Sequence, residues 1–300
     1  MLKKSSYKLR IDDAKIGILA VLLATLLLSF RSILVKLAYA EQVSVMDLFY
    51  YRFLFALPLI WCFALYKKKY EVFKEIIDKK IAFSCMLAGF FGYYLATLTD
   101  FHSLKLINVN INRIILYSFP IYVLVWNSIL ERQLPNIKNI LAFFVVQLGL
   151  FFVLGGFKES SASISHMGVA FALLSAISYS LYIIINQQVG KKIGSVLFTT
   201  YAITFSFIFI NIHYFTTFES NSSGAISSAG FVIIIIMAVF CTFIPLLLIA
   251  EGIKRIGATK FALLNTSGPI MTIVTAFLVL GETMTLQQTI GSAVVIIVLY

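Results

Sequence analysis

FVIIIIMAVFCTFIPLLLIA, residues 231–250, is an apolar run without a single charged side chain. A helix rises about 1.5 Å per residue, so about 20 residues cross a hydrocarbon core of about 30 Å. Within lipid the backbone must satisfy its own hydrogen bonds, which favours a helix over an open strand. This stretch therefore predicts a membrane-spanning helix.

Similar apolar blocks fill the rest of the chain. Of 300 residues, 60% are hydrophobic and 12% are charged, whereas soluble domains carry about 25% charged residues. The runs are too uniform for the alternating pattern of an outer-membrane barrel. We predict an all-α polytopic membrane protein with ten transmembrane helices, near residues 16–38, 48–66, 81–99, 107–130, 140–157, 168–187, 196–215, 231–250, 258–280 and 286–300.

The basic residues predict how the chain is oriented in the membrane. The formal charge is +11, but most Lys and Arg lie between apolar blocks, so we expect no nucleic-acid partner. With a cytoplasmic N-terminus, 18 basic residues fall in cytoplasmic segments, and only Lys105 and Lys158 fall in outer loops. Such a bias is typical of inner-membrane proteins. We expect a multi-pass protein of the cell inner membrane, with both termini in the cytoplasm.

The N-terminus resembles a signal peptide, because lysines precede an apolar run that ends in Ala38-Tyr39-Ala40. The run from Ile16 to Ala38 is too long for the apolar region of such a peptide, and it contains Arg31 and Lys36. We therefore expect an uncleaved first helix.

The second half of the chain echoes the first. Leu104-Lys105 followed by Pro120 returns, 149 residues later, as Ile253-Lys254 followed by Pro269. Each half holds five predicted spans, so the second copy must be inverted relative to the first. Inverted repeats are typical of secondary transporters, whose substrate site lies between the repeats near the midplane. Duplication also occurs in proteins of other functions.

These residues resemble the EamA domain of the drug/metabolite transporter superfamily. The resemblance is carried by Leu104 to Pro120 and Glu131 in the first half, and by Ile253 to Pro269 and the Gly281-Glu282 pair in the second. It implies two inverted five-helix repeats, residues 16–157 and 168–300, after a cytoplasmic segment at 1–15. It also implies a central cavity and alternating access. Members of the family carry small metabolites, often outward.

Three arginines lie within predicted spans, where ionisable residues are costly and often functional. Helical rise places Arg31, Arg52 and Arg113 in the outer third of the bilayer, with Arg52 and Arg113 about 7–10 Å from the outer face. A guanidinium can bind a carboxylate or a phosphate, so we predict that these arginines bind substrate, Arg113 foremost. The alternatives are snorkelling to the interface and internal pairing with Asp47 or Asp100.

Further polar and aromatic residues are candidates for the cavity wall. Asn110 lies on the same helix as Arg113, and Asn265 stands just before Pro269. Proline frees a backbone carbonyl one turn earlier and loosens the helix. Tyr93 and Tyr94 follow Gly89-Phe90-Phe91-Gly92, although aromatic residues at helical spacing more often serve packing. We predict substrate contacts for Asn110, Asn265, Tyr93 and Tyr94.

The chemistry of other protein classes is missing from the sequence. The three histidines are scattered and the three cysteines lack metal-ligand spacing, so we expect no metal and no cofactor. There is no Walker loop and no evident catalytic cluster, so we expect no enzyme. We predict a secondary transporter that exports or exchanges a small polar metabolite, anionic or zwitterionic, with a proton as candidate coupling ion. The alternatives are a lipid-carrier flippase component, a membrane-embedded enzyme or a structural subunit.

Overall fold

The computed structural model describes residues 11–68, 78–107, 109–153, 165–216, 226–271 and 286–299, and every regular element in these ranges is a helix. Seven helical stretches among the described residues, several of them made of two or three consecutive helices, are long and apolar enough to cross a membrane. A further apolar helix, Ile137–Val153, is shorter, and parts of the last two predicted spans lie outside the described residues. The prediction of an all-helical polytopic chain is confirmed, and the count of ten stays a prediction.

In the first half of the chain, several membrane spans consist of two or three consecutive helices. The helices of this half are α1 (Ile11–Ser29), α2 (Arg31–Ala40), α3 (Val45–Lys68), α5 (Lys79–Ala88), the π-helix η2 (Gly89–Leu95), α6 (Ala96–Leu106), α7 (Val109–Leu116), α8 (Phe119–Glu131) and α9 (Ile137–Val153). The second half contains α10 (His166–Ile193), α11 (Ser195–Thr216), α13 (Ser228–Ala238), the π-helix η4 (Val239–Phe243), α14 (Ile244–Ile256), α15 (Ala258–Asn265) and α17 (Leu286–Leu299).

Several helices run further than the hydropathy predicts. The predicted span at 168–187 is α10, which continues to Ile193. Lys191 and Lys192 lie in its last turn, where positive charge interacts favourably with the helix dipole. At the other end, the Ser165 side chain accepts a hydrogen bond from the backbone N–H of Gly168 and caps the helix. The two polar ends of α10 are thus stabilised as helix, although hydropathy does not count them as part of an apolar span.

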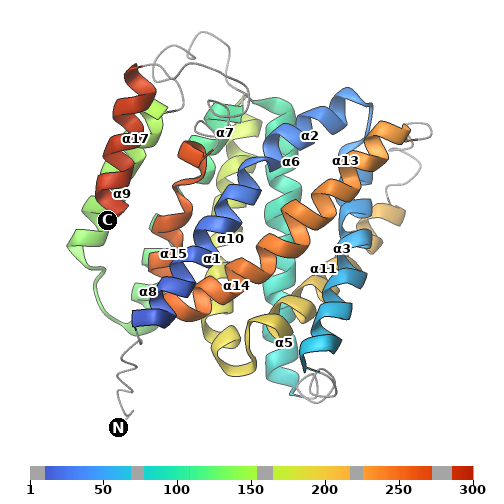
Figure 1. Ribbon diagram of the computed structural model, residues 1–300, viewed down its shortest axis with the longest axis horizontal. Helices are drawn as coiled ribbons and strands as arrows, with labels where there is room; N and C mark the ends of the chain where they lie inside the picture. Colours follow the sequence, from blue (N-terminus) through green and yellow to red (C-terminus); the bar gives the residue numbers. More distant parts are fainter. Residues whose placement is uncertain are drawn as a thin grey trace.

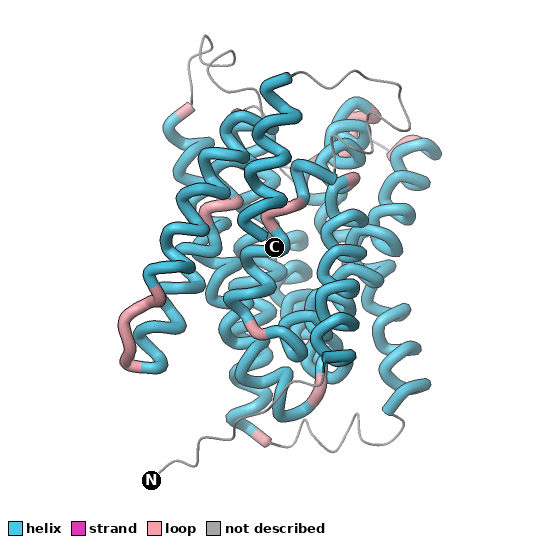
Figure 2. Tube along the Cα trace, turned by 60° about the vertical axis from the view of Figure 1, so that its left-hand side comes forward, coloured by secondary structure: helices cyan, strands magenta, loops and turns pink. Residues whose placement is uncertain are grey.

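The two halves pack against each other in corresponding pairs (Figure 1). α1 lies along α14, and α10, the first helix of the second half, lies along α6. α3 packs on α11, while α9 and α17, the last described helices of the two halves, form a pair at one edge of the bundle. The helices run roughly parallel in a single bundle (Figure 2). The pair of α1 with α14 therefore has its counterpart in the pair of α10 with α6.

Corresponding helices run in opposite directions. We call the end of the bundle where α2 and α6 end the upper end, as drawn in Figure 1, and the opposite end the lower end. α10 begins at the upper end, where the backbone of Gly168 lies against Leu106 and Ile107. α1 begins at the lower end, where a Cβ on Gly17 would lie 2.7 Å from Ile256. Small residues at such contacts let membrane helices approach closely.

Both halves break a helix just before a proline. α7 ends at Leu116, and α8 begins at Phe119 with Pro120 in its first turn. In the second half α15 ends at Asn265, a turn follows, and helix resumes at residues 268–271, around Pro269. The two breaks face each other, because a Cβ on Gly268 would overlap the Tyr117 hydroxyl. Interrupted helices at the repeat interface frame substrate sites in many transporters.

Candidate functional site

Three polar helix segments meet at one buried carboxylate near the upper end of the bundle. Asp100 of α6 forms an ion pair with Arg31, the first residue of α2. Arg113 of α7 places Nη1 4.0 Å from Asp100 Oδ1. The Asp100 side chain is 1% exposed, and those of Arg31 and Arg113 are 20% and 14% exposed. Two of the three arginines that the sequence singles out therefore share a single counter-ion.

Neighbouring polar groups hold this carboxylate in place. Asn112 donates hydrogen bonds to Asp100 Oδ1 at 3.2 Å and to Ser103 Oγ at 3.0 Å. Ser103 in turn donates to the backbone carbonyl of Gly168 at 2.8 Å, which joins the cluster to α10. Such supporting bonds fix the orientation of a charged side chain in a low-dielectric setting.

Arg52 of α3 is the most buried of the three arginines. It is 2% exposed and has no ion pair within the part of the chain that the structure describes. Its Cζ lies 4.9 Å from the ring centroid of Phe53 and 5.2 Å from that of Phe101. The Phe101 ring also attracts Arg31, whose Cζ lies 5.5 Å away. One aromatic ring thus interacts with both guanidiniums through cation–π attraction.

Asp47 does not belong to this cluster. Its carboxylate accepts hydrogen bonds from the Tyr214 hydroxyl at 2.8 Å and from Ser44 Oγ at 2.6 Å. Of the two carboxylates that could pair with the arginines, the structure uses only Asp100. Three guanidiniums therefore surround one carboxylate, which leaves the neighbourhood positively charged.

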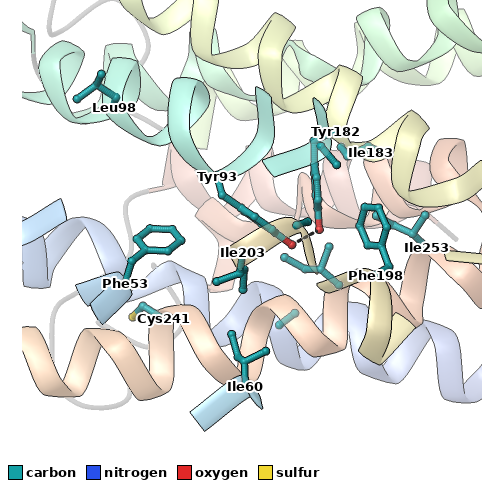
Figure 3. Close-up of a cluster of buried hydrophobic side chains, with 14 of the residues drawn as sticks. Phe53, Ile60, Tyr93, Leu98, Tyr182, Ile183, Phe198, Ile203, Cys241 and Ile253 are labelled. Atoms are coloured by element: carbon teal, nitrogen blue, oxygen red, sulfur yellow. Dashed lines mark hydrogen bonds between the residues drawn. The ribbon is translucent and has the colours of Figure 1, made fainter. Parts of the chain in front are cut away.

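A row of buried and half-buried tyrosines leads from the arginines toward the middle of the bundle. Tyr117 and Tyr179 lie within electrostatic range of Arg31. The ring of Tyr179 stacks on that of Tyr182, with 5.7 Å between centroids. The hydroxyls of Tyr182 and Tyr93 lie 2.7 Å apart, as the dashed line in Figure 3 shows. Asn186 donates to the Tyr182 hydroxyl at 3.1 Å and extends the row.

Polar contacts, some of them between the two halves, join helices at the lower end of the bundle. Asn127 of α8 donates to Thr259 Oγ1 of α15 at 3.0 Å, and Gln187 of α10 accepts from the backbone N–H of Ala258. Nearby, Arg255 of α14 forms a 2.7 Å ion pair with Asp13 of α1. These bonds join α8 and α10 to α15, and α1 to α14.

Two matches to a known family cover nearly the whole chain. The EamA-like transporter family matches residues 15–155 and again residues 166–300. The chain belongs to the EamA-like transporter family. The two matches correspond to the two halves of the chain, whose corresponding helices run in opposite directions.

Relatives of this EamA-like protein are also named as transporters. It is 30% identical over 288 residues to the uncharacterized transporter YcbK of Bacillus subtilis, covering 94% of this chain and 91% of that one. It is 23% identical to an uncharacterized transporter of Synechocystis sp., covering 93% and 90%. A crystal structure of a protein 14% identical superposes with a TM-score of 0.73 over 97% of this chain and 96% of that one, which shows a shared fold.

The structure separates the sequence-predicted site residues of this EamA-like protein into groups. Arg31, Arg52 and Arg113 lie around Phe101 and Asp100, as described above. Tyr93 lies in the tyrosine row, but Tyr94 is directed elsewhere, with its hydroxyl 3.0 Å from Nδ1 of His213. The two adjacent tyrosines therefore have different hydrogen-bond partners in this structure.

Asn265 lies at the broken helix rather than beside the arginines in any described contact. Its Oδ1 accepts a 3.0 Å hydrogen bond from Thr25 of α1. The side chain of Asn110 lies outside the described residues, although its backbone belongs to α7. Among the residues that the structure describes, no group of three His, Cys, Asp or Glu side chains is arranged to hold a metal ion.

The sequence of this EamA-like protein predicts Asp100 only as an alternative internal partner of the arginines, and it does not predict the residues that support Asp100. Asp100 fell just beyond the predicted span 81–99, and α6 continues to Leu106. Asn112, one residue before Arg113, is not among the residues predicted from the sequence to contact substrate. The one available signal was the polar run Thr97 to Ser103, which is buried at almost every position in α6.

Proposed function

We propose that this protein is a secondary transporter that exports or exchanges a small anionic or zwitterionic metabolite, such as an amino acid or an organic acid, by alternating access. The observation that carries the proposal is the cluster of three arginines on three different helices around the single buried carboxylate of Asp100. Buried charges need counter-charges, and a substrate carboxylate or phosphate supplies one.

The geometry supports a path from the arginines inward. Tyr117, Tyr179, Tyr182 and Tyr93 offer hydroxyls and ring faces from the upper end toward the middle of the bundle. At the lower end, the bonds of Asn127 and Gln187 to α15 must break before a substrate can leave there. A transporter of the alternating-access type needs one end closed while the other is accessible.

The proposal includes the membrane arrangement predicted from the sequence. We propose ten helices in two inverted five-helix repeats, 16–157 and 168–300, after a cytoplasmic segment at 1–15. The protein resides in the cell inner membrane with both termini in the cytoplasm, which makes the lower end of the bundle cytoplasmic. A proton is the proposed coupling ion.

Counterflow into proteoliposomes tests this function. Vesicles loaded with anionic, zwitterionic or cationic metabolites are assayed for uptake of the same labelled compound. We expect anions or zwitterions to exchange and cations not to exchange. Replacing Arg113 with Gln is expected to lower uptake at least about tenfold, because a charge-assisted hydrogen bond contributes about 1.5–3 kcal/mol.

The matched control is Lys138→Gln, which removes one positive charge from an exposed position at the start of α9. Its uptake is expected to equal that of the wild type. Exchange of cations alone, or full activity of Arg113→Gln, contradicts the proposal.

A further inference from the structure

Three buried donor groups near the upper end have no hydrogen-bond acceptor within the described part of the chain. They are Nε of Arg31, Nε of Arg52 and the hydroxyl of Tyr39. Leaving one buried polar group unpaired costs about 1–3 kcal/mol, and native proteins pair nearly all of them. Three donors without an acceptor in one region can be completed by an acceptor from outside the protein.

The three groups lie in one electrostatic neighbourhood. Tyr39, near the end of α2, lies within range of the charges of Arg31, Arg52 and Asp100. Arg31 and Arg52 lie within range of each other, where two like charges repel, and they interact with the same Phe101 ring. Cation–π attraction balances part of the charge, but it leaves the Nε–H group of each arginine without an acceptor among the described residues.

Arg31 and Arg52 differ in their counter-ions. Arg31 is already paired with Asp100, whereas Arg52 has no carboxylate partner among the described residues and is almost completely buried. An incoming negative charge therefore gains most at Arg52. The Tyr39 hydroxyl is the neighbouring neutral donor, and it comes from the adjacent helix of the same half.

We propose that Arg52 and Tyr39 form the subsite that holds the oxyanion group of the substrate, with the Arg31–Asp100 pair forming one wall. A guanidinium offers N–H donors in a fixed plane, which suits the two or three oxygens of a carboxylate or a phosphate. The phenolic hydroxyl donates to a further lone pair of the same group. Tyr39 is thus a specificity-determining residue. This assignment rests on the proposed function of the protein.

Binding of two simple oxyanions to the purified full-length protein tests the subsite. Acetate and methyl phosphate are titrated in nanodiscs at constant ionic strength, and the dissociation constant is taken from the shift in unfolding temperature. At least one of them is expected to bind, and the comparison tells whether the site accepts carboxylates or phosphates. Chloride at the same concentration is expected to give no shift.

Conservative variants locate the binding. Tyr39→Phe keeps the ring and removes the hydroxyl, and Arg52→Lys keeps the charge and removes the planar fork. Each is expected to raise the dissociation constant about tenfold or more, since a hydrogen bond to a charged group contributes about that factor. Tyr50→Phe, two residues from Arg52 and packed on Tyr214, is the control and is expected to bind as the wild type does.

The outcomes separate this subsite from the proposed function. In one outcome, Tyr39→Phe folds and binds the oxyanion as the wild type does while Arg113→Gln no longer binds it. That result contradicts the proposed subsite and retains the proposal of an anionic substrate. If chloride gives the same shift, the region is a general anion site and the subsite is wrong. If the wild type neither binds an oxyanion nor exchanges anionic metabolites, the proposed function and the subsite both fail.

Discussion

Asp100 is the residue on which the arginine cluster depends. It is buried, pairs with Arg31, lies 4.0 Å from Arg113 Nη1 and accepts a bond from Asn112. We predict that Asp100→Asn lowers the free energy of unfolding by about 3 kcal/mol, because removing one partner of a buried pair leaves an uncompensated charge. Thermal unfolding of the purified protein in detergent measures the effect.

A double substitution separates the charge effect from simple damage to packing. Arg31→Gln with Asp100→Asn removes both charges of the pair, and it is expected to be more stable than Asp100→Asn alone. Coupling between residues in contact is seen as this departure from additivity. Additive losses in the two single variants would contradict an energetically important ion pair.

Some of these site residues can be predicted from the sequence and others cannot, for a physical reason. A guanidinium inside an apolar run stands out by its cost, so Arg31, Arg52 and Arg113 could be selected without a structure. Tyrosine is common in membrane helices, so Tyr39 carries no such signal. Only its buried hydroxyl, which has no hydrogen-bond partner among the described residues, distinguishes it. Which tyrosines face the arginines depends on helix packing, which one sequence does not specify.

At the scale of elements, the two interrupted helices meet where Gly268 lies against Tyr117. A Cβ at residue 268 would overlap the Tyr117 hydroxyl, with the ring carbon Cζ next at 3.1 Å. We predict that Gly268→Ala lowers the free energy of unfolding by about 1–3 kcal/mol, the usual cost of overpacking. Adding Tyr117→Phe removes the clashing oxygen and is expected to restore most of this loss in the same thermal assay.

The glycine prediction has its own control. Gly190→Ala also adds a methyl group in a helix, but its Cβ would meet only the end of the Asn186 side chain, at 2.9 Å. It is expected to be tolerated better than Gly268→Ala. If Tyr117→Phe brings no recovery, the contact between the two interrupted helices is not what limits residue 268.

The interruptions were predictable in part. Pro120 and Pro269 mark them in the sequence at the repeat offset, and the bond from Ser118 N–H to the Ile115 carbonyl recurs as that from Ser267 to Leu264. The π-helices η2 and η4 also occupy corresponding places, beginning at Gly89 and Val239. Neither carries a proline at its start, and their widened turns come from packing, so hydropathy could not reveal them.

At the scale of the whole molecule, the opposite orientation of the two halves can be tested directly by chemical labelling. Lys105 and Lys254 correspond at the repeat offset, and both are exposed in the structure, near the ends of α6 and α14. α6 ends at the upper end of the bundle and α14 at the lower end. The positive-inside bias of the sequence predicts that the lower end faces the cytoplasm.

We therefore predict opposite labelling of these two equivalent positions in intact cells. In a background with the exposed Cys62 replaced by Ser, Lys105→Cys is expected to react with a membrane-impermeant maleimide, and Lys254→Cys only after the cells are opened. Cys85 and Cys241 are buried, so they contribute little background. The reverse pattern would invert the orientation of the whole protein, while labelling of both from one side would contradict the inverted repeat, because two equivalent residues of such a repeat must face opposite sides of the membrane.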